Sequence, residues 1–184
     1  MDNALLKLTE LYTSKHRHYH NLIHIANMLT MAPQELTFEQ QVAVWFHDAV
    51  YNPISDHNEE DSVELVTKLL DIDYIDQRGD INIITEIILS TKDHTPRCPE
   101  ANLVLDLDLA ILGQPAPIYQ QYVKNVAAEY APFIPTDIYR YGRQEFLKRF
   151  LEKDSFYYTD WGKRYLDEKA RENLKSELSK YTKD

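Results

Sequence analysis

With 184 residues, the chain is long enough for one domain with a sizeable apolar core, so we expect a single domain over residues 1–184. It has 20 Lys and Arg residues against 30 Asp and Glu residues, and this formal net charge of -10 argues against a general binding surface for nucleic acids or anionic membranes. The one cysteine, Cys98, excludes an internal disulfide, and no apolar run approaches the roughly 20 residues that span a bilayer. Because the start Met1-Asp2-Asn3 also differs from a signal peptide, we expect a cytoplasmic protein.

The pattern of apolar residues predicts an all-α fold. Apolar side chains recur at intervals of three and four, strand-like alternation is scarce, and the chain has only 4 glycines. We therefore expect a helical bundle. Its predicted helices cover about residues 3–14, 20–31, 38–51, 59–70, 81–91, 100–112, 118–130, 138–151 and 160–181.

The second predicted helix carries two histidines in an apolar context. His20 and His24 are four residues apart and would share one face of a helix, one turn from each other. Both imidazoles could then point at one spot, while the neighbouring leucine and isoleucines anchor the helix. Taken alone, a histidine on an apolar helix is more often a hydrogen-bonded core residue than a metal ligand.

An adjacent histidine and aspartate, His47-Asp48, end the third predicted helix. A neutral imidazole beside a carboxylate makes a good pair of ligands for a divalent metal. Such a pair also occurs by chance in many chains, so it is weak on its own. The helix residues expected to be buried are Phe38, Val42, Trp45, Phe46 and Ala49.

Polar residues at two further helix ends could surround such a site. Asn58 and Glu59 stand at the start of the fourth predicted helix, where an acidic residue has an ordinary role in favouring the helix dipole. Their functional interpretation is that one of them orients the attacking water or a bound ligand. His94 follows an apolar helix as His47 does, and it is a candidate for contacting phosphate or for helping to bind a second ion.

Two aspartates near the end of the sixth predicted helix cannot both face the same site. Asp106 and Asp108 are two residues apart, which is about 200 degrees on a helix, so they lie on different faces. Spacing alone leaves open which of them is a ligand.

In combination, these runs resemble a known superfamily. His20 and His24, then His47-Asp48, then residues 106–113 follow the order of histidine and aspartate ligands in the HD superfamily of metal-dependent phosphohydrolases. Residues 19–24, Tyr-His-Asn-x-x-His, resemble a motif of cyclic-nucleotide phosphodiesterases. The chain as a whole is similar to a small family of predicted HD phosphohydrolases through residues 17–21, 46–51, 106–113 and 170–174.

The resemblance implies a single HD-type domain with one principal metal site. Asp108 is preferred to Asp106 because the Asp-Leu-Ala run that it begins resembles the Asp-Leu-Ser run of the last ligand in the phosphodiesterases. The metal ligands implied in this way are His24, His47, Asp48 and Asp108.

The resemblance also implies roles for residues outside the ligand set. His20 matches the proton-donating position of the motif and is the candidate general acid, with an exchange of roles between His20 and His24 as the alternative. Glu59 is the second candidate catalytic residue. Arginines of the later helices are by default exposed residues in ion pairs. Arg143, within Tyr-Gly-Arg, matches a family motif and is the arginine favoured for substrate contact. Asn58 and His94, from their places at helix ends, are the other candidates for substrate contact.

The implied reaction is hydrolysis of a small phosphorylated metabolite, with nucleotides among the candidates. It needs a nucleophile at neutral pH, charge neutralisation on the phosphoryl oxygens and a proton for the leaving oxygen. Four protein ligands would close a tetrahedral site, so manganese, cobalt, iron, nickel or magnesium fits better than structural zinc, although zinc in an expanded shell also fits. The choice among phosphomonoesters, phosphodiesters and pyrophosphates stays open.

Two other functions are compatible with the pattern. An HD-type di-iron oxygenase would need further ligands for a second iron, for which His57 and His94 are candidates, but the Tyr-His-Asn motif favours hydrolysis. A non-catalytic module that senses a nucleotide or binds a partner could have lost a ligand, and none of the implied ligands is missing here. The sequence makes no prediction of the oligomeric state.

Overall fold

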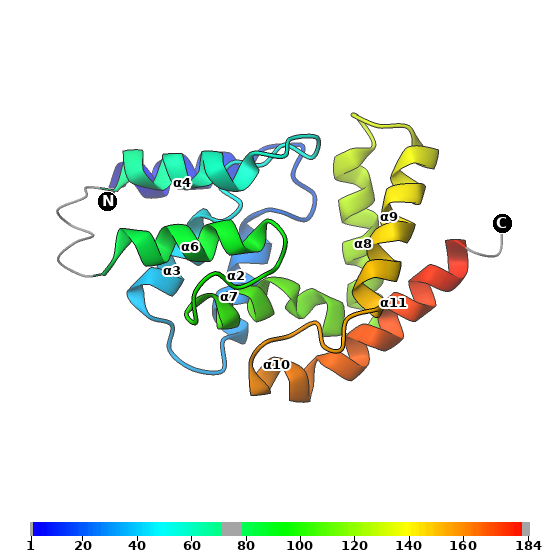
Figure 1. Ribbon diagram of the computed structural model, residues 1–184. Helices are drawn as coiled ribbons and strands as arrows, with labels where there is room; N and C mark the ends of the chain where they lie inside the picture. The colour runs from blue at the N-terminus through cyan, green and yellow to red at the C-terminus, as the bar shows by residue number, and fades with distance from the viewer. Residues whose placement is uncertain (1, 71–78, 182–184) are drawn as a thin grey trace. The chain divides into compact units, whose positions relative to one another are not determined.

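The computed structural model describes residues 2–70 and 79–181, and every regular element in these ranges is a helix (Figure 1). The described residues contain no strand, so the predicted all-α fold is confirmed. Every described helix is too short or too polar to cross a lipid bilayer. The chain divides into two compact units, Met1–Asp108 and Leu109–Asp184. The expectation of a single domain stays a prediction.

The first unit is built around two of its helices. Its described elements are α1 (Asp2–Tyr12), α2 (Leu22–Met31), α3 (Phe38–Phe46), α4 (Asn58–Leu69), α6 (Ile81–Thr91) and α7 (Ala101–Asp108). Helices α3 and α6 pack against each other, and each also packs against α4 and α7. Helix α2 lies against α3 and α7. The ends of α2, α3 and α7 carry the polar residues discussed below.

The inward face of α6 forms a central part of the core of the first unit. Ile84, Ile87 and Ile88 are fully buried, which confirms the face predicted from their spacing. Val66 of α4 and Val104 of α7 are also fully buried. This apolar core excludes water from the polar side chains that point into it.

The buried stripe predicted for α3 is wrong in part. Three residues expected inside are only half-buried: Phe38, Val42 and Trp45. Ala43 and Val44 are fully buried instead, because neighbouring helices pack against α3 on more than one side. Gln40 is buried too, and its side-chain amide donates a hydrogen bond to the Glu100 carbonyl (2.9 Å).

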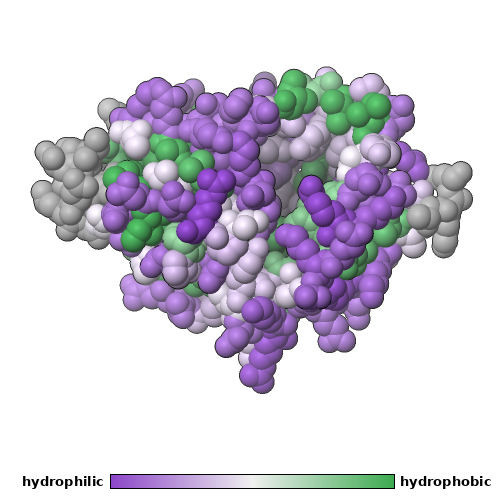
Figure 2. Space-filling model, viewed as in Figure 1, coloured by the Kyte–Doolittle hydropathy of each residue, from purple (hydrophilic) through white to green (hydrophobic). Residues whose placement is uncertain are grey.

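The second unit is arranged around its last helix. It contains the 3-10 helix η1 (Leu109–Gly113) followed by α8 (Ala116–Tyr130), α9 (Thr136–Leu151), α10 (Asp160–Tyr165) and α11 (Asp167–Tyr181). Helix α11 packs against α9, α10 and η1, while α8 packs against η1 (Figure 1). Figure 2 shows a mainly hydrophilic surface with apolar residues over the connection between α8 and α9, where Phe133 and Ile138 are exposed.

The single helix predicted over residues 160–181 is in fact two helices that meet at Leu166. The Leu166 backbone N–H donates to the Gly162 carbonyl (3.0 Å) and ends α10, after which α11 begins at Asp167. The break presses Leu166 against Gly113, where an added Cβ would lie 2.8 to 2.9 Å from Leu166 atoms. Close approach of η1 to this break therefore requires a residue without a side chain at position 113.

Candidate metal centre

His20 and His24 lie on either side of a helix start. The Asn21 side-chain oxygen accepts a hydrogen bond from the Ile23 backbone N–H (2.9 Å), so Asn21 caps α2 and the helix begins at Leu22. His24 belongs to the first turn and is only 3% exposed, whereas His20 precedes the cap. The predicted helical face shared by His20 and His24 is therefore wrong.

Helix α3 ends just before the histidine-aspartate pair. The His47 backbone N–H still donates to the Ala43 carbonyl (2.8 Å), and Asp48 lies in the turn that follows, so the helix predicted to reach residue 51 is too long. The His47 ring donates from Nδ1 to the Val44 carbonyl (3.0 Å). In the neutral imidazole this hydrogen bond leaves the lone pair on Nε2, the atom that points into the cluster.

Helix α7 delivers Asp108 rather than Asp106. Asp108 is the last residue of α7, where the α-helix predicted to run on to residue 112 gives way to η1. Asp106 is fully buried, so it is not a surface residue. Of these two aspartates, Asp108 alone belongs to a possible metal site within the described residues, together with His24 and His47. The structure thus brings the aspartate favoured by the resemblance to the imidazoles.

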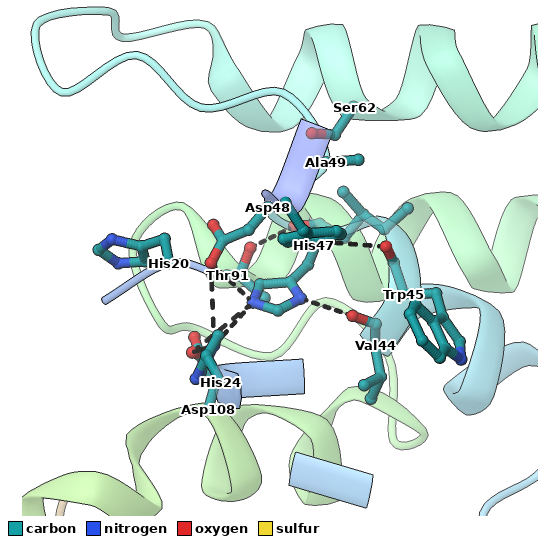
Figure 3. Close-up of polar contacts among 12 residues, drawn as sticks. His20, His24, Val44, Trp45, His47, Asp48, Ala49, Ser62, Thr91 and Asp108 are labelled. Atoms are coloured by element: carbon teal, nitrogen blue, oxygen red, sulfur yellow. Dashed lines mark hydrogen bonds and ion pairs between the residues drawn. The ribbon is translucent and has the colours of Figure 1, made fainter. Parts of the chain in front are cut away.

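His24, His47 and Asp108 point toward one another inside the first unit (Figure 3). One nitrogen or oxygen atom of each lies within 4.8 Å of the others. The two Nε2 atoms are 3.3 Å apart, and Asp108 Oδ1 lies 3.2 Å from His24 Nε2 and 3.7 Å from His47 Nε2. These three side chains could hold one metal ion.

Asp48 adds a second carboxylate beside the same two nitrogen atoms. Its Oδ2 lies 3.1 Å from His47 Nε2 and 3.8 Å from His24 Nε2 (Figure 3). The four side chains named from the resemblance therefore converge, although they come from three separate segments of the chain.

The separations between these atoms suit a divalent ion. Two nitrogen or oxygen ligands bound at about 2.1 Å are about 3.0 to 3.4 Å apart when they subtend about 90 to 110 degrees at the metal. Three of the five separations are 3.1 to 3.3 Å, and the other two are 3.7 and 3.8 Å. Two imidazoles with two carboxylates form a donor set suited to manganese, iron, cobalt, nickel or zinc.

In the absence of metal, the charges of the cluster favour a proton on the His47 ring. Burial opposes a charged His47 ring, but the Asp48 and Asp108 carboxylates overcome this and raise the pKa of His47 to about 9. Burial would raise the pKa of Asp108, but its contacts with His24 and His94 hold that pKa well below its ordinary value. Burial would also raise the pKa of Asp48, but the positive charge of His47 outweighs this effect and lowers that pKa. A metal ion must therefore displace a proton from the cluster.

This charge balance predicts how the metal-free protein responds to pH. The pKa of His47 is raised from 6.5 to about 9, so its contribution to stability is complete below pH 6.5 and is lost as the pH rises through about 9. We expect the free energy of unfolding in chelator to fall over that window by on the order of 3 kcal/mol. Thermal melts of wild-type and His47→Gln protein in chelator measure it. An equal response in the variant would contradict the assignment to His47.

His94 braces the Asp108 carboxylate. Its backbone φ of 53° lies in the left-handed region, which is unfavourable for most residues with a side chain. The turn after α6 thereby brings His94 Nε2 to 3.1 Å from Asp108 Oδ2. Asp108 then meets His24 through Oδ1 and His94 through Oδ2, which fixes the orientation of the carboxylate. Contact of His94 with phosphate or a second ion stays a prediction.

His20 lies beside the four converging side chains. Its ring stacks on Tyr51 with centroids 4.2 Å apart and planes 29° apart, and it is 6.1 Å from the His24 ring centroid. Figure 3 shows His20 to one side of the cluster, and its positive form helps to lower the pKa of Asp48. His20 is therefore close to the site without belonging to the three-residue group that could hold the metal.

Asn58 and Glu59 differ in what their side chains do. The Asn58 amide accepts from the Asn52 backbone N–H (2.9 Å) and donates to the Asn52 carbonyl (3.0 Å), so it closes the loop before α4. Glu59 is half-buried, and burial together with the charge of Asp48 raises its pKa. Glu59 is thus the one of the two that is electrostatically linked to the cluster.

Arg17 holds the site together, a role that its place in a sequence motif did not predict. Its guanidinium donates from one nitrogen to the His20 (3.0 Å) and Asp48 (2.6 Å) carbonyls, and from another to the Ala49 carbonyl (2.8 Å). The segment before α2 is thereby tied to the turn after α3. The side chain is buried and lies over the rings of Tyr12 and Tyr51.

Loss of this guanidinium should destabilise the protein strongly. Arg17→Met removes three hydrogen bonds to backbone carbonyls, and each buried polar group left unsatisfied costs about 1 to 3 kcal/mol. We expect urea unfolding to show a loss of about 3 kcal/mol or more. Arg149 is exposed, so Arg149→Met should change the free energy of unfolding by less than about 0.5 kcal/mol. Equal effects of the two substitutions would contradict the proposed role of Arg17.

Arg143 belongs to the second unit, where it forms a buried ion pair. Its Nε and Nη2 donate to the two Glu177 carboxylate oxygens at 2.9 and 3.1 Å. The later arginines were expected to be exposed and in ion pairs. Arg143 does form an ion pair, but it is buried. Contact between Arg143 and substrate stays a prediction.

His57 does not join the cluster. Its side chain is 70% exposed, and its Nε2 lies 3.2 Å from Asp56 Oδ1 at the surface. Of the two extra ligands considered for a di-iron site, only His94 therefore lies next to the four side chains.

Comparison of the chain with models of protein families, with curated proteins and with solved structures found no match. The resemblance to HD phosphohydrolases therefore rests on the motifs and stays a hypothesis.

Proposed function

We propose that this protein is a metal-dependent phosphohydrolase that cleaves a small phosphorylated metabolite. The observation that carries the proposal is the convergence of His24, His47 and Asp108 within 4.8 Å, with Asp48 beside them. Buried carboxylates and imidazoles in such a cluster are costly unless they are paired or coordinate a metal. The motif resemblance supports the same assignment.

His24, His47, Asp48 and Asp108 would hold the ion, for which manganese, iron, cobalt, nickel, magnesium or expanded-shell zinc are the candidates. When bound, a divalent ion lowers the pKa of a coordinated water and polarises the phosphoryl oxygen. The His47 hydrogen bond to Val44 keeps Nε2 available for this purpose.

His20 is the proposed general acid. It lies outside the ligand group, so it can carry a proton without giving up a metal bond. Stacking on Tyr51 fixes its ring plane, and the positive form of His20 helps to lower the pKa of Asp48. The proton would pass to the leaving oxygen as the phosphorus–oxygen bond breaks.

Glu59 is the proposed partner of the attacking water. Burial and the negative charge of Asp48 raise its pKa, which makes it a stronger base than an ordinary glutamate. The observations that favour Asn58 are weaker, because both ends of its amide already hold the Asn52 backbone.

A panel of phosphomonoesters, phosphodiesters and nucleoside polyphosphates tests the proposal. The protein is incubated with manganese, and released phosphate and nucleotide products are measured. We expect hydrolysis of at least one class, which chelator and His47→Ala abolish and His57→Ala leaves intact. Absence of hydrolysis across the panel, with oxygen consumption by iron-loaded protein instead, would favour the oxygenase.

A further inference from the structure

The second unit contains a cavity whose residues take no part in the metal cluster. It has a volume of about 350 Å³ and is lined by residues of α8, α9 and α11. Cavities that hold small molecules usually measure about 300 to 1,000 Å³. The cavity is therefore large enough for a small organic ligand.

The lining of this cavity has more positively than negatively charged side chains. Lys124 of α8, Arg140 of α9 and Lys180 of α11 all line it, and Glu177 is the one carboxylate among its lining residues. The chain as a whole carries a formal net charge of -10. The acidic excess lies in residues 1–108, because residues 109–184 have 13 Lys and Arg residues against 11 Asp and Glu residues, so the cavity belongs to the more basic part of the chain.

The charge of Glu177 is already neutralised within the second unit. Arg143 donates to both of its oxygens, at 2.9 and 3.1 Å. The Tyr181 hydroxyl donates to Oε1 (3.2 Å), and the Tyr119 hydroxyl donates to Oε2. With four donors, the carboxylate has its acceptor positions filled. Glu177 therefore does not cancel the charge of the cations that line the cavity.

The two lysines that line the cavity take no part in the ion pairs described for the second unit. Neither Lys124 nor Lys180 forms an ion pair with a residue in the described ranges. Arg140 lies over the ring of Tyr181, 5.6 Å from its centroid, and both residues line the cavity. Two lysines can offer a dianion several charge-assisted hydrogen bonds.

The lining also includes apolar surface. Tyr119 is buried and Val123 is half-buried, and both line the cavity on α8. An aromatic ring and a branched aliphatic side chain suit the flat apolar body of a ligand.

We propose that this cavity binds a small organic phosphate, with its phosphate at Lys124 and Lys180 and its apolar part against Tyr119 and Val123. The proposal does not depend on the proposed phosphohydrolase activity, because none of the metal-cluster residues lines the cavity.

Isothermal titration with phenyl phosphate tests this assignment on the full chain in chelator. We expect phenyl phosphate to bind more tightly than either inorganic phosphate or phenol. Lys124→Gln/Lys180→Gln should weaken binding about tenfold or more, because two charged hydrogen-bond donors are lost. The matched control Lys148→Gln/Lys175→Gln removes two exposed lysines outside the cavity and should bind as the wild type does.

Two further variants test whether phenyl phosphate binds inside the cavity and away from the metal cluster. Val123→Trp fills the space without changing charge, so it should also abolish binding if circular dichroism shows that the variant is folded. His47→Ala should leave binding unchanged. Binding that survives both the lysine double variant and Val123→Trp, or that His47→Ala removes, would overturn the proposal, as would a failure of phenyl phosphate to bind.

Discussion

Asp108→Asn should abolish metal binding and turnover, whereas Asp106→Asn should keep most of both. Asp108 presents Oδ1 to His24 at 3.2 Å and to His47 at 3.7 Å, so an amide at this position removes a charged donor from the cluster. Asp106 is two residues away and lies outside the possible metal site. Equilibrium dialysis against manganese and phosphate release from the best substrate of the panel measure the two effects.

Asp106 is fully buried, so its variant could lose stability, and both variants are compared at a temperature where they are folded. Metal loss in Asp106→Asn with retention in Asp108→Asn would move the ligand to Asp106. It would also contradict the alignment with the phosphodiesterase-like run.

His20→Ala should keep the metal and lose about a hundredfold to ten-thousandfold in rate on substrates with poor leaving groups, the usual contribution of a positioned acid. The reason is that His20 lies beside the cluster, stacked on Tyr51, and is not one of the four proposed ligands. Aryl phosphates with acidic leaving groups should be affected least, since these groups leave without a proton. Rates across a series of leaving groups, with metal content measured in parallel, give the comparison.

His24→Ala is the matched variant for this series. Because His24 contacts both His47 and Asp108, its loss should impair metal binding and every substrate alike. Metal loss in His20→Ala with retention in His24→Ala would exchange the two roles. A deficit in His20→Ala that is the same for all leaving groups would reject His20 as the acid.

Helix positions could be predicted well wherever a single apolar face decides burial. Ile84, Ile87 and Ile88 illustrate this, because their spacing alone places all three in the core. Phe38 and Trp45 of α3 illustrate the opposite, since both are only half-buried although their spacing placed them in the buried stripe. The break at Leu166 could not be predicted either, because it depends on the contact with Gly113.

The candidate site shows the same division between residue type and local geometry. The resemblance to HD phosphohydrolases named His24, His47 and Asp108, and these side chains meet, but the supposed helical face of His20 was wrong because Asn21 caps the helix after it. The Asn21 cap could have been anticipated, since asparagine is a favoured N-cap residue. The role of Arg17 could not have been anticipated, because it depends on hydrogen bonds to three backbone carbonyls from two separate segments.

The amount of metal bound per chain tests the candidate metal centre most directly. Protein is equilibrated with manganese at pH 8, dialysed and subjected to elemental analysis. We expect about one ion per chain for the wild type and for His57→Ala, which lacks an exposed histidine outside the cluster, and almost none for His47→Ala. Undiminished metal in folded His47→Ala protein would contradict the assignment of the metal centre.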